Sequence, residues 1–256
     1  MKRFVRILKI LLVTAFWLFL WAGLARLVGR ELLLPGPLVV LKRLGELILT
    51  ADFWKTAAVS LLRILLGTVC GVIAGAALAI LTARFRLLRA LLSPLLTIVR
   101  ATPVASFILL VLIWVGRDIL PSVIVVLMVL PVVWANVAAG IDSTDPLLLE
   151  LSRVYRFGSA KTFGRVYLPS VMPFFLSACR TSLGLAWKAG VAAEVLTVPK
   201  LAIGRMLYES KLYLETVDLF AWTVVVILCS LVIEKLLSAA IDRAGCQRKG
   251  AEHDPR

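Results

Sequence analysis

The sequence has few charged residues, a single histidine and only four cysteines. Charged residues make up 17% of its 256 residues and hydrophobic residues 61%, with a mean hydropathy of +0.98. Soluble domains are less apolar, so we expect an integral membrane protein that is all-α. His253 stands alone near the C-terminus, and the cysteines form no pair at metal-ligand spacing. We therefore expect no catalytic residue, no metal site and no cofactor.

The sequence also has no complete phosphate-binding loop. Gly67, Gly71 and Gly75 recur every four residues, but no G-K-[ST] follows them. The segment from Gly158 to Thr162 ends in Lys-Thr, but it has alanine where such a loop needs its second glycine. In a membrane, a stripe of small residues lets two helices approach closely. The three glycines therefore predict helix packing, and any nucleotide is expected on another subunit.

The net charge is +14, which could indicate a nucleic-acid partner. The lysines and arginines are instead spread over many short loops, as the positive-inside rule describes. Counting alternate loops gives fifteen on one side and eight on the other. The fifteen lie in segments 2–9, 84–89, 153–165 and 243–256. This bias predicts that both termini and the loop 142–169 are cytoplasmic, with no nucleic acid bound.

Apolar segments predict about six transmembrane helices. They cover residues 10–28, 56–81, 90–115, 119–140, 170–196 and 219–237. The first could also be a cleaved signal peptide, but its length, two tryptophans and lack of a small-residue cleavage site favour an anchor helix. Segments 38–50 and 199–218 are amphipathic and are expected along the outer surface. The sequence ends in a polar tail.

The loop 142–169 is expected to form a helix–turn–helix outside the membrane. Asp145 is a suitable helix N-cap, and Pro146 suits the first helical position. Gly158 could end this helix, and a second helix is expected from Ser159 to Leu168, before Pro169. The first helix carries many apolar residues, which would be exposed to water. A surface of this kind usually binds a partner.

Glu150, Gly158, Val166 and the pair Leu168–Pro169 form a pattern within this loop. With these residues the sequence resembles permease subunits of bacterial ATP-binding-cassette importers, in which E-A-A and a glycine precede I-x-L-P. Leu151 and Ser152 replace the two alanines, and Arg156 replaces the glycine. The resemblance extends from Leu34–Pro35 to the last apolar segment. It is strongest to the sulfonate, taurine and nitrate branch and to importers of thiamine precursors.

The resemblance implies a type I importer permease in the bacterial cytoplasmic membrane. An N-terminal anchor and outer segment would cover residues 1–55, the transmembrane domain 56–240, and a polar cytoplasmic tail 241–256. The implied partners are a separate ATPase, an external solute-binding protein and a second copy of the chain. The residues implied in coupling to the ATPase are Glu150, Leu151, Ser152, Arg153, Tyr155, Arg156, Phe157 and Gly158. The alternative is a membrane scaffold or enzyme subunit that docks a partner through the same loop.

Charged residues inside the expected spans indicate a solute pathway, because a charge in lipid is costly unless it meets water or a counter-charge. Arg63 lies near the outer end of its span and is expected to extend towards the membrane surface. Arg100, Lys188 and Glu194 are candidates for the pathway. Lys188 and Glu194 are six residues apart and cannot pair on one helix face. Lys188 should therefore meet either a carboxylate such as Glu234 or an anionic solute.

Overall fold

The computed structural model describes residues 2–251, and every regular element in this range is a helix. In chain order the elements are α1 (Lys2–Val28), α2 (Pro37–Ile48), α3 (Ala51–Arg84), α4 (Arg86–Ala101), α5 (Val104–Val111), α6 (Leu120–Asp142), α7 (Pro146–Val154), α8 (Ser159–Thr162), the π-helical turn η1 (Phe163–Tyr167), α9 (Leu168–Thr197), α10 (Ile203–Leu212) and α11 (Thr216–Ala251). The all-α prediction is confirmed. His253 and the last residues of the predicted tail lie outside the described range.

Four of the described helices are long and apolar enough to cross a membrane. They are α1 through Leu11–Val28, α3, α6, and α11 through Thr216–Leu236. The pair α4 and α5 would make a fifth span, although it is bent by 107°. α9 has 30 residues but carries three charged side chains and is not among the four. A total of six spans, with α9 as the sixth, stays a prediction.

Helices α3, α6 and α9 form the centre of the fold, and the glycine stripe lies where α3 contacts α6. A Cβ atom added to Gly67 would lie 2.7 Å from the carbonyl oxygen of Ser122, and one added to Gly75 would lie 2.6 Å from that of Leu130. At Gly71 the same atom would lie 2.9 Å from Cβ of Val129. Only glycine allows the two backbones to come this close.

The third apolar segment is not the single helix that its length suggests. α4 ends at Ala101, and α5 begins at Val104, after Thr102 and Pro103. Proline disfavours the helical conformation of the preceding residue, and Thr102 is extended, with ψ of 132°. Pro103 also has no N–H group to continue the ladder of hydrogen bonds. The prediction of one span over 90–115 is therefore wrong about its continuity.

Two other predicted boundaries also fall inside helices. The boundary at 55/56 lies within α3, which begins at Ala51 with Thr50 as its N-cap. The polar tail was expected from residue 241, but α11 continues to Ala251.

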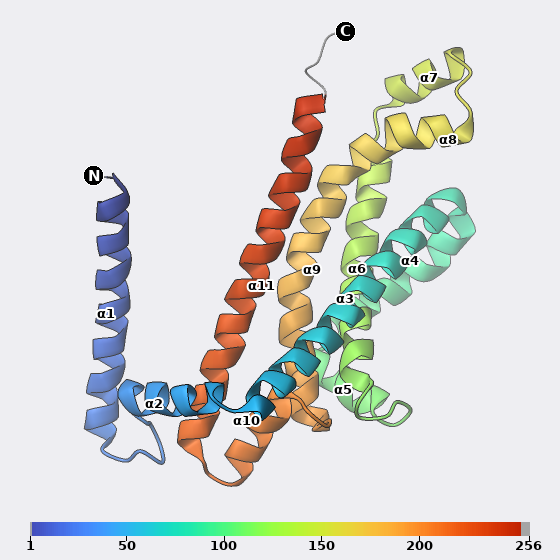
Figure 1. The fold of residues 1–256 in the computed structure, drawn as a ribbon. Helices are drawn as coiled ribbons and strands as arrows, with labels where there is room; N and C mark the ends of the chain where they lie inside the picture. Colours follow the sequence, from blue (N-terminus) through green and yellow to red (C-terminus); the bar gives the residue numbers. More distant parts are fainter. Residues whose placement is uncertain (1, 252–256) are drawn as a thin grey trace.

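Short helices lie at two opposite ends of the molecule, beyond the long helices (Figure 1). The loop helices α7 and α8 lie at one end, together with the beginning of α1 and the end of α11. Helices α2 and α10 lie at the opposite end, where they connect the long helices. Arg43 of α2 donates to Asp218 at 2.9 Å, and the hydrogen bonds of Asp218 and Glu46 raise the pKa of Arg43. This ion pair fastens α2 to the start of α11.

Candidate functional site

The first loop helix, α7, begins as its sequence predicts. The Asp145 carboxylate accepts a hydrogen bond from the backbone N–H of Leu147 at 2.8 Å, and Pro146 occupies the first turn. On the membrane side, Arg89 of α4 donates to Asp142 at 2.9 Å. These contacts fix the point at which the chain leaves α6. The loop is therefore anchored at its base, while α7 projects away from the long helices (Figure 1).

The outer face of α7 is apolar and exposed. Its exposed residues are Leu147, Leu148, Leu151, Val154 and the following Tyr155. Tyr155 is 68% exposed and Leu151 49%. Glu150 and Arg153 are also exposed, and within the described part of the chain neither forms an ion pair. Both charges therefore remain available to a partner.

Ser152 occupies the opposite face of α7 and is buried. Its hydroxyl donates to the carbonyl oxygen of Leu149 at 2.7 Å, which satisfies the one polar group of a small side chain. α7 also contacts η1. The apolar face and the buried small residue thus share one short helix.

The first loop helix, α7, ends earlier than the sequence predicts. The helix stops at Val154, and Arg156 adopts a left-handed conformation with φ of 50°. The N–H of Phe157 then donates to the carbonyl of Ser152 at 2.8 Å, and that of Arg156 to Arg153 at 3.0 Å. This pair of bonds is a Schellman motif, which usually has glycine at the left-handed position. Gly158 lies two residues later, with φ of −65°, and instead precedes α8.

Phe157 lies in the turn between the two loop helices and is half-buried. The ammonium of Lys161 lies 4.2 Å from its ring centroid, and the ring of Tyr155 lies 6.3 Å away. A cation over an aromatic face is attracted to the ring quadrupole. Phe157 therefore supports the turn from within, whereas Leu151 and Tyr155 face outward.

The second loop helix does not stop before Pro169. α8 continues through η1 directly into α9, where Leu168 and Pro169 occupy the first turn. Proline is tolerated in a first turn, where its missing N–H costs nothing. Val166 is buried in η1. The loop is thus connected to the long helix α9 without a flexible linker, and the joint between α8 and α9 is a π-helical turn.

Lys188 lines a cavity of about 330 Å³ between α9 and α11. Arg180, Trp187 and Glu234 line it as well. The Lys188 side chain is exposed, and within the described residues it forms no ion pair with Glu234 or any other carboxylate. Arg100 lies at the end of α4, exposed and outside this cavity. Of the three pathway candidates, only Lys188 reaches this space.

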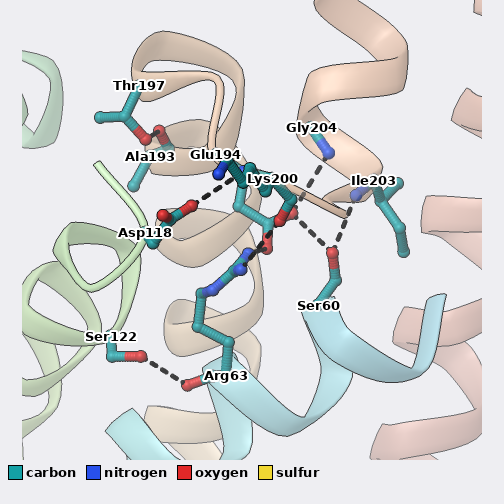
Figure 2. A network of polar contacts seen from close by, with 10 residues as sticks. All are labelled: Ser60, Arg63, Asp118, Ser122, Ala193, Glu194, Thr197, Lys200, Ile203 and Gly204. Carbon is teal, nitrogen blue, oxygen red and sulfur yellow. Dashed lines mark hydrogen bonds and ion pairs between the residues drawn. The ribbon is translucent and has the colours of Figure 1, made fainter. Parts of the chain in front are cut away.

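Glu194 lies elsewhere, fully buried between α3, α9 and α10 (Figure 2). Its Oε1 accepts from Nη1 of Arg63 at 2.9 Å, and its Oε2 accepts from the Ser60 hydroxyl at 2.9 Å. Arg63, which was expected to extend towards the membrane surface, thus donates to a buried carboxylate. Sequence reasoning missed this pair. The available signal was an opposite charge near the outer end of each of two apolar segments.

Together the fold and the loop define a class of protein: a helical membrane protein that presents an apolar helix at one end, outside its long helices. The model of the family described as binding-protein-dependent transport system inner membrane component matches residues 67–244. This chain belongs to that family. It is the inner-membrane permease component of an ABC import system, whose ATPase is a separate subunit and whose further partner is a binding protein.

Individual relatives agree with this assignment. A probable ABC transporter permease protein of Brucella melitensis biotype 1 is 31% identical over 210 residues, which cover 81% of this chain and 84% of that protein. The taurine transport system permease protein TauC of Escherichia coli strain K12 is 26% identical, covering 81% and 78%. The fold resembles a solved amino acid ABC transporter with a TM-score of 0.60 and 18% identity, covering 72% of this chain and 90% of that one.

Proposed function

We propose that this permease binds its ATPase through the loop 142–169, and that this loop and both chain ends face the cytoplasm. The observation that carries the proposal is the exposed apolar face of α7, centred on Leu151 and Tyr155. Water-exposed apolar surface of this kind is typical of a docking site. The excess of lysine and arginine in segments on this side supports the orientation.

The connection from α7 to α9 supports a lever mechanism for coupling. When the ATPase dimer closes on ATP, it would move α7 and, through η1, the start of α9. Because α8, η1 and α9 are continuous, a displacement at the loop is transmitted to the membrane helix. The exposed charges of Glu150 and Arg153 would orient α7 on the ATPase, and Arg156 and Gly158 would shape the turn.

Truncation of the α7 face tests the proposal. Leu151→Ala with Tyr155→Ala should reduce co-purification of the ATPase by about 30-fold or more, since the loss of central interface anchors costs about 2 kcal/mol or more. A matched control is Leu212→Ala with Tyr213→Ala, which removes 60% and 69% exposed side chains of the same types at the opposite end. Equal association in both double variants would contradict the docking role.

We further propose that Lys188 faces the translocation pathway and meets a solute with an anionic group. A lysine at the bilayer centre costs about 3 kcal/mol unless it meets water or a counter-charge, and Lys188 forms no ion pair within the described chain. The taurine permease relative is consistent with a solute that carries a sulfonate. A second copy of this chain would enclose the pathway, giving a homodimer of permeases.

The substitution Lys188→Met separates the two roles of this lysine. If it serves the pathway, uptake should fall while membrane insertion and ATPase association persist. Lys42→Met, in the surface helix α2, is the control and should leave uptake unchanged. If Lys188→Met instead prevents insertion, and changing Glu234→Gln in addition restores it, the lysine is structural. The mass of the intact complex measures the number of permease copies, with two expected.

A further inference from the structure

A polar network connects three helices at the end of the molecule that carries α10. We call Ser60, Arg63, Glu194 and Gly204 the outer latch (Figure 2). Oε2 of Glu194 accepts from Ser60 at 2.9 Å and from the backbone N–H of Gly204 at 3.2 Å. Oε1 accepts from Arg63 at 2.9 Å. A single carboxylate thereby connects α3, α9 and α10.

The cost of burying this ion pair indicates a role beyond stability. Glu194 is fully buried, and the Arg63 side chain is 11% exposed. Apolar residues of similar volume usually stabilise such a site at least as well as a buried ion pair does. Charged groups within a membrane segment therefore mark functional sites more often than structural ones. The outer latch satisfies both carboxylate oxygens, so it is complete in this conformation.

The N-terminus of α10 depends on the outer latch for its cap. Its N-cap residue, Ala202, has no side chain that can accept a hydrogen bond. The N–H of Ile203 donates to the Ser60 hydroxyl at 2.8 Å, and that of Gly204 donates to Glu194. A Cβ atom at Gly204 would lie 2.4 Å from Cβ of Glu194, so the α10 backbone rests directly on α9. Without the carboxylate, the N–H of Gly204 loses its acceptor and α10 loses this polar contact with α9, while the bond from Ile203 to Ser60 is not made by the carboxylate.

The segment that connects α9 to α10 is strained. Val198 and Leu201 have φ of 48°, a left-handed conformation that is unfavourable for all residues except glycine, and most of all for β-branched ones. The N–H of Lys200 donates to Asp118 at 2.9 Å, and Arg63 donates to the carbonyl of Lys200 at 3.2 Å. Side-chain bonds thus hold a backbone that would relax if α10 moved away. Such strain persists only where the surroundings enforce it.

We infer that the outer latch is a conformational switch that holds α10 against α3 and α9 and opens during the transport cycle. Strain in the segment 198–202 favours release, and the Glu194 hydrogen bonds oppose it. α10 lies at the end of the molecule opposite to α7, so its release would open the far end of the pathway (Figure 1). This inference rests on the proposed orientation for naming that end the outside.

Thiol labelling of Ala202→Cys tests the inference. Ala202 is fully buried, and the four native cysteines would be replaced first. The intact complex of permease and ATPase is placed in lipid nanodiscs, where a maleimide reaches both faces whatever the orientation. We expect slow labelling without nucleotide and labelling about tenfold faster with ATP and vanadate, the change that corresponds to losing one charge-assisted hydrogen bond. Equal rates in the two states would overturn the inference.

Two variants should shift the equilibrium between the closed and the open outer latch in opposite directions. Glu194→Gln weakens the outer latch and should make labelling fast without nucleotide; a rate equal to that of the parent would overturn the inference. Val198→Gly removes strain without touching the ion pair and should slow labelling about threefold. If Glu194→Gln does not fold, Val198→Gly decides: an unchanged rate overturns the inference.

A matched control separates the effect of the outer latch on labelling from the effect of any strained residue near α10. Leu214 also has a left-handed conformation, with φ of 60°, but it follows α10 and lies outside the segment 198–202. Leu214→Gly should leave the labelling rate of Ala202→Cys unchanged. Slowing equal to that of Val198→Gly would show that flexibility at either end of α10 governs labelling, and would contradict the specific role of the outer latch. The change with ATP and vanadate requires a coupled ATPase, but the rates of Glu194→Gln and Val198→Gly without nucleotide do not. These two rates can therefore fail or succeed independently of the proposed coupling role.

Discussion

At one end of the molecule α7 leaves Leu151 and Tyr155 exposed, whereas at the other end Glu194 is buried with both oxygens satisfied. Each end also contains non-glycine residues in the left-handed conformation, Arg156 at the first and Val198 at the second. At the first end the strain lies in an exposed turn, and at the second it lies beside a buried ion pair. The comparison shows that α7 leaves apolar side chains in contact with solvent, whereas α10 is bound by polar groups of its own chain.

The largest expected effect is at the buried ion pair. Arg63→Met leaves the Glu194 carboxylate buried without its counter-charge and should destabilise the protein by about 3–5 kcal/mol. Arg205→Met breaks the half-exposed pair with Glu209, and should cost about 1 kcal/mol or less. Thermal unfolding of the purified complex measures both. Equal losses of stability would contradict the expectation that the buried Arg63–Glu194 pair matters more than the Arg205–Glu209 pair.

A smaller effect is expected in the glycine stripe. Gly75→Ala places a Cβ atom 2.6 Å from the carbonyl of Leu130, and overpacking of this kind costs about 1–3 kcal/mol. Gly23→Ala in α1 is the control, because nothing lies within 4 Å of its added atom. The same unfolding measurement applies. A stable Gly75→Ala protein would mean that α3 and α6 can separate slightly without loss.

The smallest effect is expected at the turn after α7, and it has the opposite sign. Arg156→Gly should stabilise this turn by roughly 1 kcal/mol or less, because glycine adopts the left-handed conformation without strain. Arg156→Ala removes the charge but retains the Cβ atom, and should not stabilise it. Hydrogen exchange of the Phe157 amide, which donates to Ser152, reports on the turn. Slower exchange in the alanine variant would assign the effect to charge.

The same two ends explain how much the sequence could predict. The start of α7 was predicted correctly because Asp145 and Pro146 act within one helical turn. Its end was not, because the glycine rule favoured Gly158, whereas the backbone bonds of the turn impose the left-handed conformation on Arg156. The apolar face of α7 follows from residue spacing alone. Local patterns therefore predicted the exposed apolar face of α7 but not the geometry of the turn that follows it.

Local sequence patterns could not predict the contacts between distant segments. Arg63 and Glu194 are 131 residues apart, and helical periodicity does not say which faces of two apolar helices meet. The break at Pro103 was indicated by the proline, but the sequence did not give the 107° bend between α4 and α5. The glycine stripe predicted close approach by α3 and could not identify α6 as its partner. The family resemblance supplied the class of protein, while these contacts required the structure.

Cross-linking of α7 to the ATPase tests the central claim most directly. In a permease without native cysteines, Leu151→Cys and Leu212→Cys each place one thiol on an exposed face, at opposite ends of the molecule. A short thiol-to-amine reagent is added to the complex in native membranes, and the products are identified by the mass of the joined chains. We predict that Leu151→Cys cross-links to the ATPase and that Leu212→Cys does not. Cross-linking of the ATPase through position 212 and not through position 151 would contradict both the docking site and the orientation.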